Sequence, residues 1–294
     1  MESSAVMAAL PLTIDPTIVA LCAAMEGKAA GELPRPYLGM SAIGEECERK
    51  LWYNWRWMED SKFDALTLAR FADGHYSEDA IAARLREVDG IVLETHLEDG
   101  RQIGFSDMEG HFRGHMDGII TGLLQAPKTP HVWEHKCVNE TKFKKLNTLK
   151  ADVGEKNALQ QWDEVYYAQA VLYMHYAKID RHYLTVATAG SRELTSARTE
   201  ANPEFAKQLI MKAENILNAD QPPGRAYKDA SFYKCKWCPY SEQCHFDEPP
   251  KRTCRSCAHA EPVEDGQWRC NYVGQLIPTI QDQVNACGTW RSLV

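Results

Sequence analysis

The placement of the cysteines is the feature that most narrows how this chain can fold. Seven of its 10 cysteines lie in the final fifth, whereas Cys22, Cys47 and Cys137 are scattered. Because the cytoplasm keeps thiols reduced, clustered cysteines in a cytoplasmic chain are more typical of metal ligands than of disulfides. We therefore expect that metal ions bound by these cysteines hold the C-terminal tail together. The clustered cysteines are Cys235, Cys238, Cys244, Cys254, Cys257, Cys270 and Cys287.

Composition supports a cytoplasmic location and limits the mode of nucleic-acid binding. The 294 residues carry a formal net charge of -8, so any nucleic-acid contact must come from a local basic surface rather than from the whole chain. No stretch reaches the roughly 18 apolar residues of a membrane span, and no basic segment precedes the first apolar residues. We expect a cytoplasmic protein without membrane attachment.

Hydrophobic periodicity predicts one α/β core with a mixed sheet, followed by a small tail. We place the core at residues 1–250 and a cysteine-rich module at 251–294. Residues 1–60 are expected to be mostly helical. Beyond them the pattern predicts helices near 65–88, 157–178 and 203–218, and strands near 91–95, 101–107, 112–120, 131–137, 181–188 and 192–199.

Acidic and basic residues stand out in two of the predicted strands. Asp117 lies among β-formers and glycines in the strand 112–120. Glu134 and Lys136 are two residues apart in the strand 131–137, so they share one face. Two carboxylates and a lysine suit phosphodiester hydrolysis with Mg²⁺ or Mn²⁺. The competing interpretation of Glu134 and Lys136 is a solvated ion pair on a strand surface.

Two predicted helices place polar groups beside these strands. His75 and Glu78 follow the apolar spacing of the helix 65–88, which indicates either a metal ligand or a hydrogen-bonded core pair. Gln169 and Tyr173 share an aromatic face of the long helix, where they can reach the site or simply pack on the sheet. The helix face containing His75 and Glu78 also includes Leu68, Phe71, Ala82 and Leu85.

This order of motifs resembles the RecB-like branch of the PD-(D/E)-x-K nuclease superfamily over roughly residues 40–250. The resemblance implies a restriction-endonuclease-like three-layer core with a central mixed sheet. Met116 stands where the superfamily name has proline. By resemblance, His75 or Glu78, Asp117, Glu134 and the backbone carbonyl of His135 would hold the metal, Lys136 would be the catalytic lysine, and Gln169 and Tyr173 would complete the motif set.

Some relatives in this branch, the AddB-type helicase-nucleases and CRISPR-adaptation exonucleases, carry an iron–sulfur cluster. In them one cysteine before the nuclease core and three after it bind [4Fe–4S]. The segment C-x2-C-x5-C and the upstream Cys47 are similar to that arrangement. The resemblance therefore implies Cys47, Cys235, Cys238 and Cys244 as cluster ligands.

The remaining tail cysteines predict a second metal site. Cys254, Cys257, Cys270 and Cys287 form C-x2-C-x12-C-x16-C, which suits tetrahedral zinc, and His259 is a substitute ligand. A rival grouping, with Cys235, Cys238, Cys254 and Cys257 on one zinc ion, also has good spacing. We favour the first grouping because it uses eight cysteines in two complete sets. Cys22 and Cys137 are expected to be small core residues.

Several segments offer positive charge or aromatic rings for DNA. The lysines of residues 141–150 can grip phosphates or serve only solubility. The aromatic residues 52–57 can stack on bases, but packing around Cys47 explains them better. In the tail, positive charge is expected at the surface from Lys228, Lys234, Lys236, Lys251, Arg252 and Arg255.

The resemblance implies an exonuclease that processes DNA ends, single-stranded or otherwise, in recombination, repair, phage replication or CRISPR adaptation. Helicase, annealing, integrase or other recombination partners and a homo-oligomer are compatible with this function. One alternative is a non-catalytic nucleic-acid-binding or assembly protein on a nuclease fold. Another is a redox or regulatory metalloprotein in which Glu134 and Lys136 form a surface ion pair.

Overall fold

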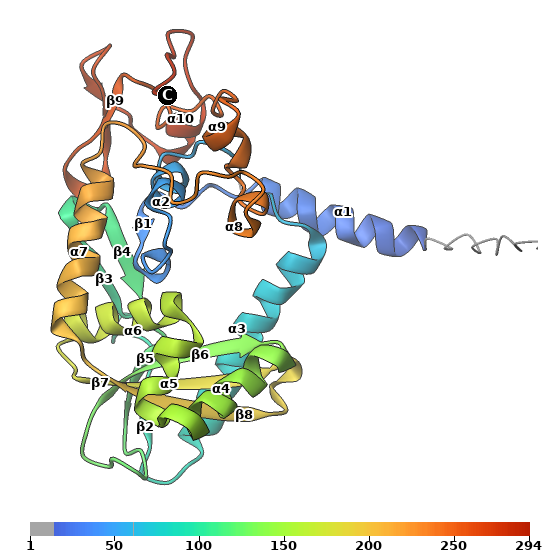
Figure 1. The fold of residues 1–294 in the computed structure, drawn as a ribbon, viewed down its shortest axis with the longest axis vertical. Helices are drawn as coiled ribbons and strands as arrows, with labels where there is room; N and C mark the ends of the chain where they lie inside the picture. The colour runs from blue at the N-terminus through green and yellow to red at the C-terminus, as the bar shows by residue number, and fades with distance from the viewer. Residues whose placement is uncertain (1–14, 61) are drawn as a thin grey trace, which may run out of the picture.

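A five-stranded sheet forms the centre of the computed structural model, which describes residues 15–60 and 62–294 (Figure 1). Its strand order is β2-β5-β6-β7-β8. β6 and β7 run parallel and the other pairs are antiparallel, so the predicted mixed α/β architecture is confirmed. The strands span Val92–Glu94 (β2), Gly118–Thr121 (β5), His131–Val138 (β6), Arg181–Thr188 (β7) and Leu194–Glu200 (β8).

Helices cover both faces of this sheet, and its central strands β6 and β7 bury residues on both sides. Val132 and Leu184 pack with one set of helices in the main core, whereas Trp133 packs with Ile81 of α3 in a second cluster. The sheet is thus the middle of three layers. The helices are α3 (Ala65–Arg86) on one face and α4 (Glu140–Val153), α5 (Glu155–Trp162) and α6 (Glu164–Ala177) on the other.

The predicted strand 112–120 is two strands in different sheets. β4 (Phe112–His115) pairs with β1 (Leu38–Gly39) and β3 (Gly104–Asp107), whereas β5 joins the central sheet. Gly118 permits this change of sheet, because an added Cβ there would lie 2.7 Å from the Glu94 carbonyl oxygen. Asp117 therefore lies in the break rather than within a strand.

The predicted long helix 157–178 is also interrupted. Asp163 separates α5 from α6, and its side chain accepts a hydrogen bond of 2.9 Å from the Tyr166 backbone N–H. An aspartate at this position is a favourable helix N-cap, so it starts a new helix instead of continuing the old one. The same carboxylate accepts from Lys142 Nζ at 2.6 Å, which ties α4 to this break.

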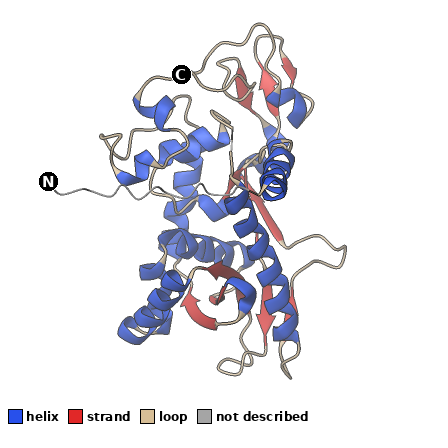
Figure 2. Cartoon of the chain, turned by 90° about the vertical axis from the view of Figure 1, so that its right-hand side faces the viewer, coloured by secondary structure: helices blue, strands red, loops and turns tan. Residues whose placement is uncertain are grey.

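The remaining elements are the other helices and the cysteine-rich end. α7 packs on α6 and α2, and the cysteine-rich end lies opposite the central sheet (Figure 2). These elements are α1 (Pro16–Ala30), η1 (Met40–Ala42), α2 (Glu48–Trp55), η2 (Met108–Gly110), η3 (Ala189–Ser191), α7 (Pro203–Leu217), α8 (Tyr233–Lys236), α9 (Ser241–His245), β9 (Ala260–Pro262), η4 (Glu264–Gly266), β10 (Trp268–Cys270), β11 (Gln275–Leu276) and α10 (Ile280–Val284).

No helix in the described part of the chain is both long and apolar enough to cross a bilayer.

The cysteine-rich end shares a hydrophobic core with α2. The Trp55 and Trp268 rings have centroids 5.1 Å apart, and both belong to the main core cluster. Among the aromatic residues 52–57, Trp52, Tyr53, Trp55 and Trp57 are all buried, which favours the packing interpretation over base stacking. The core is thus continuous across residue 250, and a separate module at 251–294 stays a prediction.

A buried arginine holds this junction together. Arg255 is 0% exposed, and its guanidinium carbon lies 3.8 Å from the centre of the Trp57 ring and 4.8 Å from that of Trp268. It donates to Gln283 Oε1 at 2.8 Å and to the Trp55 carbonyl at 3.3 Å. Burial, and then the nearby charge of Arg56, lowers the pKa of Arg255 to about 8. The expectation that Arg255 adds surface charge was wrong, because it packs between two indoles.

Replacing Arg255 by alanine should lower the free energy of unfolding by about 2–4 kcal/mol, since it opens a cavity between two indole rings and leaves buried acceptors unpaired. Urea denaturation of Arg255→Ala and wild type measures this. Arg252→Ala is the matched control, because Arg252 is exposed three residues away, and it should change stability by less than about 0.5 kcal/mol. Equal losses in the two variants would contradict the prediction.

Candidate active site

The structure brings Asp117, Glu134 and Lys136 together at the edge of the break between β4 and β5. Glu134 is 2% exposed, and its Oε2 accepts from Lys136 Nζ at 2.9 Å. The same ammonium lies 4.0 Å from Asp117 Oδ2. The Asp117 backbone N–H donates to Glu134 Oε1 at 3.2 Å. The three groups predicted from two separate strands therefore form one ionic cluster, in which Glu134 is buried and Asp117 and Lys136 are partly buried.

The backbone of β6 fixes the position of Asp117. Asp117 Oδ2 accepts the His135 backbone N–H at 2.8 Å, so a side-chain oxygen takes the place that a neighbouring strand carbonyl would otherwise occupy. Because β5 restarts at Gly118, opposite Trp133, the carboxylate is held level with Glu134. The interruption of the strand thus positions the site.

Carboxyl groups outnumber ammonium groups in this cluster. Burial, and then the charge of Asp117, raises the pKa of Glu134 to about 8. The same two causes, in the same order, raise the pKa of Glu78 to about 7. Burial alone would lower the pKa of Lys136, but the charges of Glu134 and Asp117 outweigh it and the net shift is upward. Three carboxylates share one ammonium, which is the charge balance that favours binding a cation.

Of the two candidate ligands on α3, Glu78 is the one whose pKa is raised by the charge of Asp117. Glu78 is partly buried, whereas His75 is exposed. The buried side of α3 also differs from the predicted face, because Phe71 is 48% exposed while Ser77 and Ile81 are buried. Ser77 is buried by its hydrogen bonds, so it sets which face of α3 is turned toward the sheet. A search for the spacing of apolar residues does not include serine.

A buried polar clamp joins α3 to the central sheet, and sequence reasoning missed it. Ser77 Oγ lies 2.8 Å from His135 Nε2 and 2.8 Å from Ser191 Oγ, and His135 Nδ1 lies 3.0 Å from Thr185 Oγ1. Burial, and then the charge of Lys136, lowers the pKa of His135 to about 4, so the imidazole is neutral at pH 7. The clamp fixes α3 one residue away from Glu78. The only signal in the sequence was strand alternation, which turns the His135 side chain away from Glu134.

Gln169 and Tyr173 of α6 complete the surroundings of Glu134. Gln169 Nε2 donates to Glu134 Oε2 at 2.8 Å. Tyr173 is buried, and burial, followed by the charge of Glu134, raises its pKa. The structure therefore brings these two motif residues to the ionic cluster. Their roles in catalysis stay predictions.

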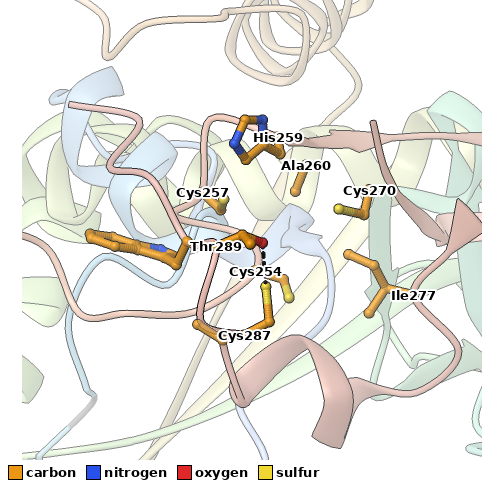
Figure 3. Close-up of a pocket in the computed structure, with 10 residues that line it drawn as sticks. Cys254, Cys257, His259, Ala260, Cys270, Ile277, Cys287 and Thr289 are labelled. Carbon is orange, nitrogen blue, oxygen red and sulfur yellow. Dashed lines mark hydrogen bonds between the residues drawn. The ribbon is translucent and has the colours of Figure 1, made fainter. Parts of the chain in front are cut away.

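The eight tail and upstream cysteines divide between two cavities. The set that includes Cys47 lines a cavity of about 320 Å³. The set that includes Cys254 lines a smaller cavity of about 20 Å³ together with His259 (Figure 3). The rival grouping would require thiols from both cavities to meet. The larger cavity holds Cys47, Cys235, Cys238 and Cys244, and the smaller one holds Cys254, Cys257, Cys270 and Cys287.

The thiols of each set are neighbours but are not arranged as ready ligands. Among residues 15–60 and 62–294, no three His, Cys, Asp or Glu side chains converge closely enough to hold a metal ion. Contacts between distant segments nevertheless bring the first set together, because Glu46 accepts from Lys234 Nζ at 2.7 Å, next to Cys47 and Cys235. In the second set, burial, and then the charge of Cys287, raises the pKa of the Cys254 thiol to about 11.

Cys22 and Cys137 were expected to be small core residues, but this prediction was wrong because both are only partly buried.

No family model matches this chain, and no curated protein matches it. Similar solved structures include SSO0001 (14% identity, 78% of this chain and 95% of that chain, TM-score 0.42). An alkaline exonuclease from Laribacter hongkongensis, LHK-Exo, matches at 12% identity over 66% of this chain and 90% of its own, with a TM-score of 0.43. A phage-related exonuclease from Haemophilus somnus 129PT matches at 13% over 50% and 69%, with a TM-score of 0.34. These values are too low to assign a family or an activity.

The raised pKa of Glu78 predicts how stability changes with pH when divalent ions are chelated. Its folded pKa of about 7 lies above the usual value of 4.5, so its stabilising contribution is complete below about pH 4.5 and is lost as pH rises through 7. For this partly exposed carboxyl we expect about 1–2 kcal/mol after solvent screening. Glu78→Gln should reduce the fall in unfolding free energy between pH 5 and pH 8 by that amount.

Urea titrations in EDTA at several pH values measure the fall. Glu87→Gln, at the exposed end of the same helix, is the control and should keep the wild-type slope. A Glu78→Gln slope equal to that of wild type would mean that Glu78 titrates normally.

Proposed function

We propose that this protein is a metal-dependent DNA nuclease that hydrolyses phosphodiester bonds at the cluster of Asp117, Glu134 and Lys136. The observation that supports it best is the surplus of buried and partly buried carboxyl groups around a single lysine. Such a surplus is costly without a cation, and carboxylate oxygens are the donors that Mg²⁺ and Mn²⁺ prefer. The chemistry of these donors therefore suits a magnesium or manganese ion, although the side chains would have to move closer together to bind it.

Each residue of the cluster has a proposed role. Asp117, Glu134 and the backbone carbonyl of His135 would hold the ion, with Glu78 favoured over His75 as the ligand from α3. When bound, the ion would polarise the scissile phosphate and lower the pKa of a water molecule. Lys136 would orient that water or stabilise charge on the phosphate. Gln169 keeps Glu134 oriented by its 2.8 Å hydrogen bond, and Tyr173 would support it.

The burial of this cluster argues against a solvated ion pair. An exposed pair of Glu and Lys on a strand contributes little and needs no surrounding donors. Glu134 is instead 2% exposed and accepts from Lys136, Gln169 and the Asp117 backbone. A buried carboxylate with three donors suits a site whose geometry must be fixed before the reaction begins.

DNA ends are the proposed substrate, single-stranded or duplex. We carry this from the order of motifs, which implies an exonuclease acting in recombination, repair, phage replication or CRISPR adaptation. Helicase, integrase or other recombination partners, and a homo-oligomer, belong to the same proposal.

We also propose a structural role for both cysteine sets. Cys47, Cys235, Cys238 and Cys244 would bind [4Fe–4S], and the second set would bind zinc. The cavity volumes support this division, because about 20 Å³ suits one small ion and about 320 Å³ leaves room for a larger group. A cluster on the first set would join residue 47 to residue 244 and so close a long loop of chain.

Lys136→Ala, Asp117→Ala and Glu134→Ala should each reduce Mn²⁺-dependent cleavage by about a hundredfold or more, since each removes a charge from the reaction centre. The assay digests end-labelled linear DNA and closed circular DNA, single- and double-stranded, with anaerobically purified protein. Lysine-dependent loss of linear DNA alone would indicate an end-dependent nuclease.

Lys207→Ala is the matched control, because Lys207 is an exposed lysine of α7. It should cleave as wild type does. Full turnover in all three cluster variants would overturn the nuclease assignment, and no cleavage by wild type under any condition would favour a DNA-binding or assembly protein.

The two cysteine sets should lose different metals. Cys47→Ala should remove iron and visible absorbance and lower thermal stability, whereas Cys270→Ala should remove zinc only. Metal analysis of anaerobically purified protein measures both. Cys22→Ala should keep both metals. Loss of iron from Cys270→Ala would show that the cysteines are grouped differently.

A further inference from the structure

An exposed row of aromatic residues lies beside the larger cysteine cavity. Trp237 is 81% exposed and Tyr233 is 62% exposed, and both line the rim of that cavity. Trp52, Trp133 and Trp268, by contrast, are fully buried. Exposing a large indole to water is unfavourable, so Trp237 is a candidate for contact with a ligand. We call residues 225–237, which contain this row, the aromatic strap.

Three rings of the strap, those of Tyr227, Phe232 and Tyr233, lie close enough together to form a continuous row. The centroids of Tyr227 and Phe232 are 4.3 Å apart, and those of Phe232 and Tyr233 are 4.7 Å apart. At the end of the row, Lys236 Nζ lies 5.8 Å from the centre of the Trp237 ring. The strap thus combines a row of three rings with an ammonium group beside Trp237.

The charge of the strap is opposite to that of the whole chain. It contains four basic residues and one acidic residue, Asp229, in a protein with a net charge of -8. Lys234 is bound to Glu46, so Arg225, Lys228 and Lys236 are the exposed cations that remain for a ligand. An aromatic row flanked by exposed cations on an acidic protein is complementary to a polyanion that also has flat rings.

We propose that the aromatic strap binds single-stranded DNA. Unpaired bases would stack on Trp237 and Tyr233, while Arg225, Lys228 and Lys236 would contact phosphates. A duplex hides the faces of its bases, so the strap would favour single strands. In Figure 1 the strap helix α8 lies on the part of the cysteine-rich end that is turned toward the sheet. This inference rests on DNA being the substrate, but binding can be measured without cleavage.

The test is fluorescence anisotropy of a labelled oligo-dT of about 20 nucleotides in EDTA, where no cleavage occurs. Trp237→Ala and Tyr233→Ala should each weaken binding by roughly 5- to 150-fold, as expected for loss of one stacked base. Lys228→Ala should reduce the dependence on salt concentration by about 0.7 in log–log slope. Wild type should bind an abasic strand and a duplex more weakly, and the two aromatic variants should bind them as wild type does.

Matched variants separate stacking from general damage. Tyr272→Ala removes an exposed aromatic ring that lies outside the strap, and this variant should bind as wild type does. Trp237→Phe should recover most of the affinity, because a ring is restored. Since Trp237 lies between Cys235 and Cys238, iron content is measured alongside, and Tyr233→Ala tests stacking outside that loop.

The outcomes distinguish the strap from the nuclease proposal. Unchanged oligo-dT affinity in both aromatic variants, or an equal loss on abasic strands, would overturn the strap as a stacking surface even if cleavage is observed. Tighter binding of oligo-rU than of oligo-dT would overturn the assignment to DNA. The expected losses in a protein that cleaves nothing would leave the strap standing and remove only the nuclease assignment.

Discussion

The hydrogen bond from the His135 backbone N–H to the Asp117 carboxylate is the interaction on which the site depends. It forms because the chain leaves one sheet after β4 and enters another at β5, which leaves Asp117 free of both ladders. The side chains of Glu134 and Lys136 lie on one face of β6, where they contact that carboxylate, and the side chain of His135 lies on the other face. A continuous strand would have kept Asp117 in the ladder, and the charge cluster would not assemble in this form.

The two faces of β6 carry different groups. One face carries Glu134 and Lys136 toward α6, where Gln169 donates to Glu134. The other face carries His135 toward α3, where Ser77 binds it. Hydrogen bonds of fixed length hold α3 in one orientation, whereas purely apolar contacts would tolerate sliding. The placement of Glu78 beside the site follows from that orientation.

The cysteine-rich end is also held by contacts between segments that are far apart in the sequence. Arg255 lies between Trp57 and Trp268, so residues about two hundred positions apart share one packed layer. The ion pair of Glu46 and Lys234 brings the chain near Cys47 to the chain near Cys235. Contacts between residues far apart in the sequence therefore surround both cysteine cavities.

The sequence alone determined the mixed α/β class, the strands β6 and β7, and the residues of the charge cluster, because period-two alternation and the chemistry of carboxylates are local properties. The spacing of the cysteines left two groupings open, and only the structure places Cys47, Cys235, Cys238 and Cys244 at one cavity and Cys254, Cys257, Cys270 and Cys287 at another. Only the tertiary structure decided the break at Asp117, the partial burial of Glu78 against the exposure of His75, and the burial of Arg255. Each depends on which distant groups supply hydrogen bonds or ring faces. No local pattern contains that information, because the partners lie up to two hundred residues away.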